Sequence, residues 1–454
     1  MSKVSIVVPS KNVKDYIGKC LDSLINQTLK DIEIICVDAF STDGTREIIK
    51  EYVNKDDRVI LLDDDKGSSG YADNLGFAYA KGEYVGIVES DDYAHKDMME
   101  CLYEKAHAYS LDYIKADFSM FVEINEKMLE IDRVGQIDRL NIYDKIISPS
   151  DYPELLELDG YMWKGIYRKS FIEENNIKLN ETKGAAYQDN GFLHQTICLA
   201  NRVMYIRDSF YYYRRDNENS SDYNPKGLQM MYDEYDFIDS FMKNNFDKVR
   251  NFRYYYYFKM YQQFCGQLKK FLRSNKDYGL ISELVGRYKN MFLKGIKNGG
   301  VRQSEFGSLI NEIYMLCFDE KLYIKKLTHS IKCFNKTCVE LFKEISSKKS
   351  VVIVCFGNKG QSLYCWLTRN GCRNIVAICD NNPSVHGKIH YEHEILSVEN
   401  ACKYYSSAYF MVANDAYYTQ IMKQLLDNGI SFDQMERFNL PMGPHASTIQ
   451  VINS

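Results

Sequence analysis

Short apolar runs alternate with amphipathic segments between residues 3 and 88. The runs are rich in Ile and Val, and the segment after the first run carries Ile17, Leu21 and Leu24 at helical spacing. A strand, a helix and a second strand in succession form a βαβ unit, which builds parallel sheets. We therefore expect an α/β fold with a mainly parallel sheet flanked by helices. The predicted strands span residues 3–9, 32–37, 58–62 and 84–88.

Polar and acidic residues follow each of these predicted strands. In a parallel sheet the carboxyl ends of the strands meet at one edge, and ligands bind beyond that edge. We therefore expect the segments after the strands to line one crevice. These segments are residues 10–12, 38–43, 63–69 and 89–93.

The remaining sequence predicts two further parts. Residues 126–223 mix strand, turn and helix patterns, and we expect them to complete the first domain and cover the crevice. Helical periodicity then dominates, and a second βαβ series begins at Ser350. The predicted domains are an α/β domain at 1–223, a helical connector at 224–349 and a small Rossmann-like α/β domain at 350–454.

The predicted C-terminal domain carries part of a dinucleotide-binding pattern. Gly357 follows an apolar strand and Asp380 ends the next strand, as in the first βαβ unit of a Rossmann domain. However, Asn358 and Lys359 stand where a second glycine would let a pyrophosphate approach the backbone. We therefore favour a role in assembly or acceptor positioning over dinucleotide binding.

Charge and cysteine content narrow the function classes. The chain has 57 Lys+Arg against 62 Asp+Glu and a formal net charge of -5, so it has no global basic field to bind nucleic acid. Its 13 Cys contain no C-x-x-C pair, which indicates reduced thiols. Without a signal-peptide pattern or a run of roughly 20 apolar residues, we expect a cytoplasmic protein.

The strongest candidate for chemistry is the segment Glu89, Ser90, Asp91 and Asp92, directly after an apolar strand. Three carboxylates this close repel one another unless cations neutralise them. Mg²⁺ or Mn²⁺ binds oxygen ligands and often takes one or two carboxylates plus substrate phosphates. The alternative is a solvated acidic turn or a helix N-cap. Nearby His95 is a candidate to complete a metal shell, although a helix start is the favoured interpretation of that residue.

Five segments in order resemble the family-2 glycosyltransferases with the GT-A fold. The resemblance covers about residues 3 to 220. The segments are S-I-V-V-P-S-K-N at 5–12; V-D-A-F-S-T-D-G-T at 37–45; A-D-N-L-G at 72–76, with A-K-G-E-Y at 80–84 and E-S-D-D at 89–92; W-K at 163–164 with Y-Q-D-N at 187–190; and Y-Y-Y-R at 211–214.

The resemblance implies roles for three carboxylates. Asp91 would ligate the Mn²⁺ or Mg²⁺ that bridges the donor diphosphate, and Glu89 stands where the family has its first aspartate. Asp189 would be the catalytic base, because an inverting transfer needs one carboxylate to take the proton of the acceptor hydroxyl. A helix N-cap is the alternative for Asp189. Burial would have to raise the basicity of this carboxylate, which is a weak base in water.

The same resemblance implies a nucleotide-sugar donor, with a UDP-sugar as the first guess. Three departures from the family pattern leave the base open: Ala39 and Phe40 replace the aspartate and glycine of V-D-D-G, and Asp73 replaces an arginine. The predicted donor-binding residues are Pro9, Ser10, Asn12, Asp38, Asp73, Asn74, Glu89, Ser90, Asp91 and Arg214.

Several side chains allow both a functional and a structural interpretation. Arg214 would bind a phosphate oxygen through its guanidinium, or lie on a surface strand whose tyrosines face the core. Trp163 would stack on an acceptor sugar, or belong to the core. Asp92 is the second predicted acceptor-binding residue. The basic, aromatic segment 253–273 would lie on an anionic membrane surface or form a packed helix with a solvated charged face.

Together these patterns and the family resemblance predict an inverting, metal-dependent glycosyltransferase. The resemblance alone implies a role in bacterial surface polysaccharide (capsule or lipopolysaccharide) assembly. We expect a glycan or lipid-linked glycan acceptor, a location in the cytoplasm that extends to the inner face of the membrane, and no nucleic acid partner. A homo-oligomer is left open. One competing function is nucleotidyl transfer, but residues 9–12 are not the Gly-rich basic loop that a triphosphate needs. The other is a catalytically silent nucleotide- or glycan-binding scaffold with a retained GT-A fold.

Overall fold

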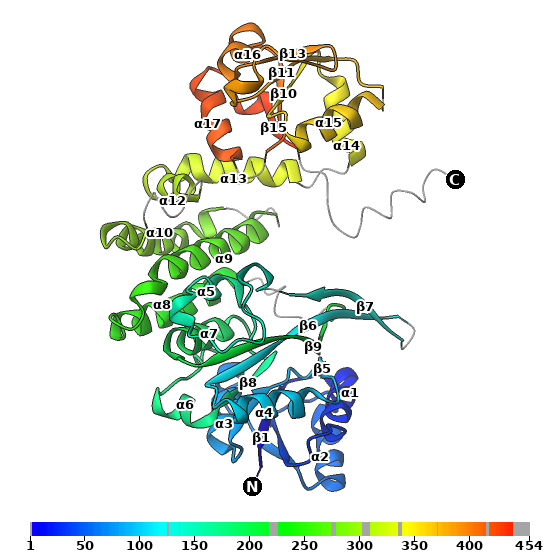
Figure 1. The fold of residues 1–454 in the computed structure, drawn as a ribbon, viewed down its shortest axis with the longest axis vertical. Coiled ribbons are helices and arrows are strands. Elements are labelled where there is room, and N and C mark those ends of the chain that lie inside the picture. Colours follow the sequence, from blue (N-terminus) through cyan, green and yellow to red (C-terminus); the bar gives the residue numbers. More distant parts are fainter. Residues whose placement is uncertain are drawn as a thin grey trace. The chain divides into compact units, whose positions relative to one another are not determined.

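A computed structural model of the chain shows two compact units, Met1–Gln267 and Leu268–Ser454 (Figure 1). The described residues are 2–124, 127–135, 137–217, 226–273, 278–301, 309–334, 338–369, 371–414 and 417–438. The predicted boundaries after residues 223 and 349 are not tested by this two-way division and stay predictions.

The first unit is built on a sheet whose first half is parallel. Its strand order is β3-β2-β1-β4-β8-β6-β9-β5, with β7 paired to β6. β1 pairs in parallel with both β2 and β4, and β2 pairs in parallel with β3. The strands are β1 (Val4–Ser10), β2 (Ile32–Asp38), β3 (Val59–Asp63), β4 (Tyr84–Ile87), β5 (Tyr93–Ala94), β6 (Tyr113–Ile124), β7 (Lys127–Val134), β8 (Gly165–Arg168) and β9 (Val203–Arg214). The predicted mainly parallel sheet is confirmed.

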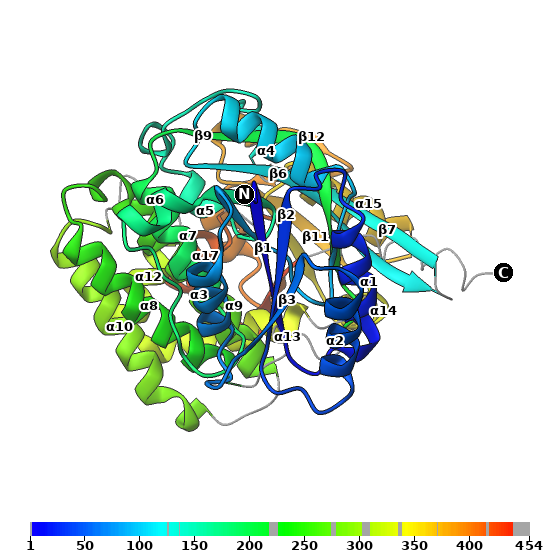
Figure 2. The same cartoon turned by 90° about the horizontal axis from the view of Figure 1, so that it is seen from below.

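Helices cover both faces of this sheet. Figure 2 shows α1 and α2 on one side of β1, β2 and β3, and α3 on the other side. Every residue of β1 and β2 is buried, because helices cover both faces of these strands. The helices of the unit are α1 (Lys14–Ile25), α2 (Thr45–Lys55), α3 (Ser69–Tyr79), α4 (Met98–Ala108), α5 (Leu155–Leu158), α6 (Lys169–Glu174), α7 (Gln188–Leu199), α8 (Gly227–Asn244) and most of α9 (Arg253–Arg273).

The predicted face of α1 is confirmed, because Ile17, Leu21 and Leu24 are buried in the core beneath it. On the other side of the sheet, α3 approaches β1 closely at Gly76. A Cβ atom at Gly76 would lie 2.4 Å from Cγ1 and 2.6 Å from Cγ2 of Val7. The glycine therefore sets how closely α3, which carries Asp73, packs on the strand.

Gly76→Ala is expected to destabilise the first unit by about 1–3 kcal/mol, because the added methyl overlaps a buried, β-branched side chain. Chemical denaturation of the purified protein measures this change. Gly266→Ala on α9 is the matched control, since its Cβ would meet nothing within 4 Å and Ala favours a helix by up to about 1 kcal/mol over Gly. Equal stabilities of the two variants would contradict the close approach of α3.

The second unit is Rossmann-like, as predicted. Its sheet has the order β12-β13-β11-β10-β14-β15, and all of its pairs are parallel except β12 with β13. The strands are β10 (Val351–Val354), β11 (Ile375–Cys379), β12 (Ile389–His390), β13 (His393–Leu396), β14 (Tyr409–Val412) and β15 (Met435–Arg437). The helices are α10 (Ser282–Lys297), α12 (Leu309–Phe318), α13 (Glu320–Phe334), α14 (Cys338–Ser347), α15 (Asn358–Arg369), α16 (Val398–Tyr404) and α17 (Tyr418–Asp427).

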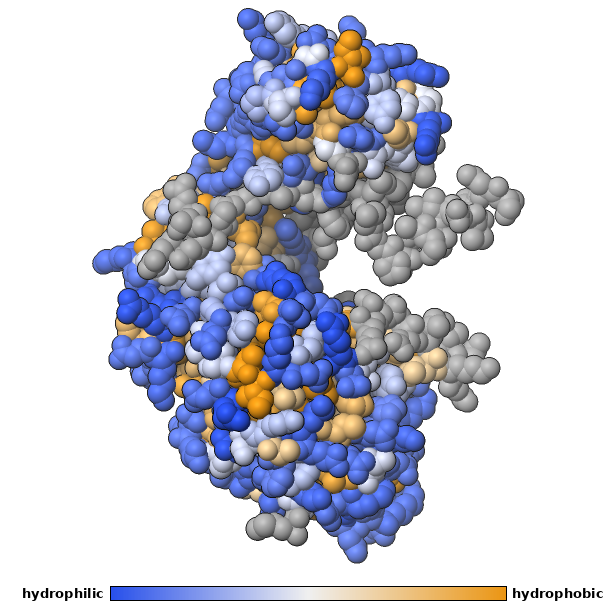
Figure 3. Space-filling view, viewed as in Figure 1, coloured by the Kyte–Doolittle hydropathy of each residue, from blue (hydrophilic) through white to orange (hydrophobic). Residues whose placement is uncertain are grey.

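Asp380 follows β11, and both of its oxygens accept backbone hydrogen bonds, Oδ2 from Phe356 N (2.7 Å) and Oδ1 from Asn382 N (2.8 Å). This carboxylate therefore holds the strand ends together. The surface seen in Figure 3 is largely hydrophilic. Within the described ranges, no helix combines the length and the hydropathy needed to cross a bilayer.

Candidate active site

Four carboxyl groups from three separate segments come together at the carboxyl edge of the sheet. They are Asp73 on α3, Glu89 and Asp91 after β4, and Asp189 at the start of α7. Burial, together with the charges of Asp91 and Asp189, raises the pKa of Glu89 to about 8. We call this group the acidic cluster. Asp91, the predicted metal ligand, and Asp189, the predicted base, are thus both close enough for their charges to act on Glu89.

Asp73 is the most buried member of the acidic cluster. Its side chain is 0% exposed and neither carboxyl oxygen has a hydrogen-bond partner. Burial raises the pKa of Asp73 well above its usual range, and the charges of Glu89 and Asp189 act in the same direction. In the proton-bound form this carboxyl group is a neutral hydrogen-bond donor beside the other carboxylates.

The loop that carries Glu89 and Asp91 is fixed to β9 through Asp92. Oδ2 of Asp92 accepts a hydrogen bond from the Tyr211 hydroxyl (2.8 Å), and Oδ1 accepts one from Arg214 N (2.7 Å). The Tyr211 oxygen also accepts a hydrogen bond from Glu89 N (3.0 Å). Asp92 thus joins the loop to β9, and its predicted contact with an acceptor stays a prediction.

Arg214 is also held by protein groups. Its Nε donates to the Asp91 carbonyl (2.8 Å), and its Nη1 lies 3.2 Å from both Glu123 and Asp216. The guanidinium lies over the rings of Tyr16 and Phe121, and Arg214 as a whole is 4% exposed. These contacts serve the architecture of the loop, and the predicted phosphate contact of Arg214 stays a prediction.

The environment of Asp91 fits a cation that takes few protein ligands. Its Oδ2 accepts a hydrogen bond from Asn217 Nδ2 (2.7 Å), and it repels the buried carboxyl groups of Glu89 and Asp92. In the part of the chain that the structure describes, no three His, Cys, Asp or Glu side chains form a metal site. A divalent ion here would therefore depend on substrate oxygens for most of its shell.

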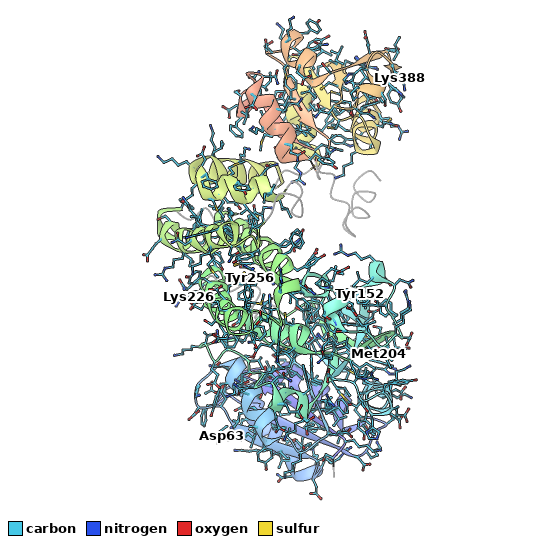
Figure 4. All side chains as sticks on the ribbon, turned by 60° about the vertical axis from the view of Figure 1, so that its left-hand side comes forward. Asp63, Tyr152, Met204, Lys226, Tyr256 and Lys388 are labelled. Carbon is cyan, nitrogen blue, oxygen red and sulfur yellow. The ribbon has the colours of Figure 1, made fainter. Side chains whose placement is uncertain are left out.

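The residues predicted to hold the nucleotide base lie at the ends of β1 and β2. The Asp38 carboxylate accepts hydrogen bonds from Ser41 N (3.0 Å) and Ser41 Oγ (2.6 Å) and from Arg46 Nη1 (3.2 Å). Ser10 Oγ lies 3.4 Å from the same carboxylate. Arg46 also bridges to Asp63 at the end of β3, which Figure 4 labels. Asp38 is thus already in contact with protein donors.

Arg46 was missed by the sequence argument, although it follows the predicted V-D-A-F-S-T-D-G-T segment directly. Its guanidinium lies 5.7 Å from the ring centroid of Phe40, which is 55% exposed and has a φ of +51°. The phenylalanine thus stands out from the strand end in the left-handed conformation that its family counterpart, a glycine, adopts easily.

Among the other predicted donor-binding residues, Asn12 and Asn74 bind neighbouring loops. Asn12 Oδ1 accepts from Thr42 N (2.9 Å), while Asn74 exchanges hydrogen bonds of 2.9 Å with the Leu179 backbone. Pro9 and Ser90 are buried. Their predicted contacts with a donor stay predictions.

Trp163 and His95 take up positions that match their structural interpretations. Trp163 is 6% exposed, stacks on Tyr211 with ring centroids 4.1 Å apart, and meets Phe118 edge-on. His95 lies just before α4, where its Nδ1 accepts a hydrogen bond from Asp97 N (3.3 Å). The predicted stacking of an acceptor sugar on Trp163 stays a prediction.

Glu234 on α8 is a site residue that the sequence argument did not identify. Its Oε1 accepts a hydrogen bond from Gly191 N (2.7 Å) in the first turns of α7, and its Oε2 accepts one from Asn180 Nδ2 (3.0 Å). Burial raises the pKa of Glu234 to about 8, against the effect of these two hydrogen bonds and together with the charge of Asp189. The helical periodicity of α8 gave no signal for this contact.

Glu234→Gln is expected to flatten the dependence of stability on pH. The folded protein holds the Glu234 proton up to about pH 8, whereas the unfolded chain releases it near pH 4.5. The free energy of unfolding of the wild type therefore decreases as the pH rises from 4.5 to about 8. The fall is at most about 1.4 kcal/mol per pH unit. Denaturation curves at pH 5, 7 and 9 measure it. The exposed Glu51→Gln is the control, and parallel curves for Glu234→Gln and wild type would contradict the shift.

Comparisons with known proteins agree with this geometry. Residues 5–173 match the family described as Glycosyl transferase family 2. The chain is 31% identical over 217 residues to glycosyltransferase GlyA of Streptococcus pneumoniae, covering 47% of this chain and 30% of that protein. It is 29% identical over 230 residues to the poly(ribitol-phosphate) beta-glucosyltransferase of Bacillus spizizenii, covering 48% and 33%. The aligned part thus spans about a third of each relative.

A solved structure shows the same fold. Residues 1–349 of S. aureus TarS, crystallised in complex with UDP, superimpose with a TM-score of 0.52 at 19% identity, covering 73% of this chain and 91% of that chain. The predicted family and fold are confirmed by these matches. The unit that holds the acidic cluster is therefore a family-2 glycosyltransferase domain with the GT-A fold.

Proposed function

We propose that this chain transfers a sugar from a nucleoside diphosphate donor to a saccharide hydroxyl with inversion at the anomeric carbon. The observation that carries the proposal is the meeting of Glu89, Asp91 and Asp189 at the carboxyl edge of the sheet. Two separate carboxylates serve the two ends of such a reaction, because one end develops negative charge on the leaving diphosphate and the other releases a proton.

In the proposed reaction the acceptor hydroxyl oxygen forms a bond to the anomeric carbon while the bond from that carbon to the diphosphate breaks. Asp189, half-buried at the first turn of α7, takes the hydroxyl proton. Asp91 would hold Mn²⁺ or Mg²⁺, which stabilises the charge of the diphosphate. Asp73, in its proton-bound form, would donate a hydrogen bond to a donor oxygen without repelling the phosphates.

The donor class rests on two supports. The family match implies a nucleotide sugar, and TarS was crystallised with UDP, so a UDP-sugar is the first candidate. The acceptor is proposed to be a glycan or lipid-linked glycan of a bacterial surface polymer, as the similarity to a poly(ribitol-phosphate) beta-glucosyltransferase suggests. Transfer would take place in the cytoplasm or at the inner face of the membrane.

Thermal-shift binding tests the proposal. The purified protein is mixed with UDP, GDP, CDP, ADP or dTDP, with and without Mn²⁺, because a ligand that binds only the folded state raises Tm. We expect one nucleotide to raise Tm only with metal, and Asp91→Asn to lose that rise. The exposed Asp208→Asn on β9 is the control. Absence of a shift with every nucleotide would contradict the proposal and favour a binding scaffold without turnover.

A further inference from the structure

A chain of side-chain hydrogen bonds leads from α8 through α9 to Asp189. The Tyr235 hydroxyl donates to Oε1 of Gln263 (2.6 Å), and Nε2 of Gln263 donates to Oδ1 of Asn190 (2.8 Å). Nδ2 of Asn190 then donates to Oδ1 of Asp189 (3.3 Å) and to the Tyr187 carbonyl (3.2 Å). We call Tyr235, Gln263 and Asn190 the relay.

The direction of each hydrogen bond in the relay follows from its neighbour. The Tyr187 carbonyl can only accept, so the Asn190 amide nitrogen faces it and donates to Asp189 as well. The Asn190 oxygen therefore accepts from the Gln263 amide nitrogen, and the Gln263 oxygen accepts from the Tyr235 hydroxyl. The orientation of two amides therefore places a hydrogen-bond donor, rather than an acceptor, beside the Asp189 carboxylate.

The backbone that carries Asp189 is fixed from the same side. The Asn190 carbonyl is 2.7 Å from Nδ1 of His194, whose pKa is lowered to about 3 by burial, so this neutral ring donates through Nδ1. The rings of Tyr235 and Tyr256 meet the His194 ring edge-on, and Figure 4 labels Tyr256 on α9. Tyr187, before the helix, has a φ of +72°, a strained conformation that the surrounding packing must hold.

Titratable groups from four elements interact with Asp189. Three are carboxyl groups: Asp73 on α3, Glu89 after β4 and Glu234 on α8. Lys259 lies on α9 one turn before Gln263, is 4% exposed, and donates to the Asp159 carbonyl (3.3 Å). Helices α8 and α9 thus supply both a charge and an oriented donor to the start of α7.

We propose that Tyr235 and Gln263 are positioning residues of the transferase, which hold Asp189 in the orientation that accepts the acceptor proton. They lie outside residues 5–173, where the family match ends. The helical segment predicted as a connector therefore completes the active site. This inference rests on the proposed function, because it assigns a partner to the proposed base.

Gln263→Glu is the sharpest test. The glutamate still accepts from Tyr235 but presents an oxygen to Asn190, so the Asn190 amide must turn its own oxygen toward Asp189 or lose its partner. Gln263→Leu removes both hydrogen bonds without adding charge. Gln262→Glu is the matched control, since it makes the same chemical change at the exposed neighbour on α9.

Release of nucleoside diphosphate from UDP-glucose, UDP-N-acetylglucosamine and GDP-mannose, with water as acceptor, gives kcat and KM. We expect kcat to fall about tenfold to a hundredfold in both Gln263 variants, because a small displacement of a reacting group costs this much. KM for the donor should stay within about twofold, since ground-state binding is untouched. Only Gln263→Glu should also move the acidic limb of the kcat profile upward, by about half a pH unit, because its charge opposes deprotonation of Asp189.

The outcomes separate this inference from the proposed function. An unchanged kcat and pH profile in both Gln263 variants, with Asp189→Asn inactive, would overturn the relay and leave the proposed base in place. Equal effects of Gln262→Glu and Gln263→Glu would also overturn it, because a general effect of charge on α9 would then explain the result. Normal turnover by Asp189→Asn, or no turnover of any donor by the wild type, would contradict the proposed function and the relay with it.

Discussion

Asp189→Asn is expected to lower kcat by about 10²- to 10⁴-fold, the usual contribution of a positioned general base. The amide has almost the same shape as the carboxylate, and Asn190 and Gln263 remain in place beside it. However, an amide cannot take a proton from the acceptor hydroxyl. Nucleotide binding should therefore be retained, with the rise in Tm produced by the nucleotide and Mn²⁺ close to that of the wild type.

The comparison that makes this result specific uses Asp91→Asn and Asp208→Asn. Asp91→Asn should lose the metal-dependent rise in Tm, so the two cluster variants fail at different steps. Asp208→Asn makes the same chemical change at an exposed position on β9 and should keep both properties. If Asp189→Asn lost nucleotide binding as completely as Asp91→Asn, Asp189 would belong to the donor site and another group would be the base.

The fold could be predicted well because its signals are local. Strands such as 32–38, buried on both faces, produce apolar runs that no surface segment shows, and α1 shows its apolar stripe at regular spacing. The antiparallel pairs of the sheet were harder to predict. The strand 113–124 pairs with β7, β8 and β9, and only tertiary contacts decide which partners a strand of mixed pattern will take.

The site was predictable only in part, for a physical reason. Asp91 and Asp189 stand in short segments that resemble a family, so sequence alone pointed to them. Glu234 and Gln263 act through contacts with residues about 40 to 70 positions away in the sequence, and their own neighbours are ordinary helix residues. The packing of Trp163 on Tyr211 could not be predicted from residue type, because a tryptophan that binds a sugar and one that fills a core look the same in a sequence.

A second group of buried charges lies in the first unit, around Asp159. Asp159 accepts a hydrogen bond from Lys115 Nζ (2.6 Å), and its other oxygen forms an ion pair with Lys164 Nζ at 3.0 Å. The Tyr205 hydroxyl also donates to Asp159 (2.9 Å), and Lys259 donates to its carbonyl. The side chains of Asp159 and Lys115 are fully buried.

Asp159→Asn is expected to destabilise the protein by about 3–5 kcal/mol at pH 7, because it leaves buried lysines without their counter-charge. Burial already lowers the pKa of Lys115 to about 8, although the charge of Asp159 opposes this effect. Without Asp159 the pKa of Lys115 in the folded protein falls below its wild-type value, and so lies even further below the pKa of a lysine in the unfolded chain. The loss of stability should therefore shrink as the pH rises to about 8, where the wild-type Lys115 releases its own proton. Chemical denaturation at pH 7 and 9 measures both parts of this expectation.

Two further variants identify buried charge as the cause. Asp138→Asn removes a carboxylate from an exposed ion pair with Arg207 (2.8 Å) and should cost at most about 1 kcal/mol. Lys115→Met should be less harmful in the Asp159→Asn background than in the wild type, because it removes one of the uncompensated charges. If Asp159→Asn cost no more than Asp138→Asn, or if Lys115→Met gave the same loss in both backgrounds, Asp159 would not be the counter-charge that lets the first unit bury Lys115.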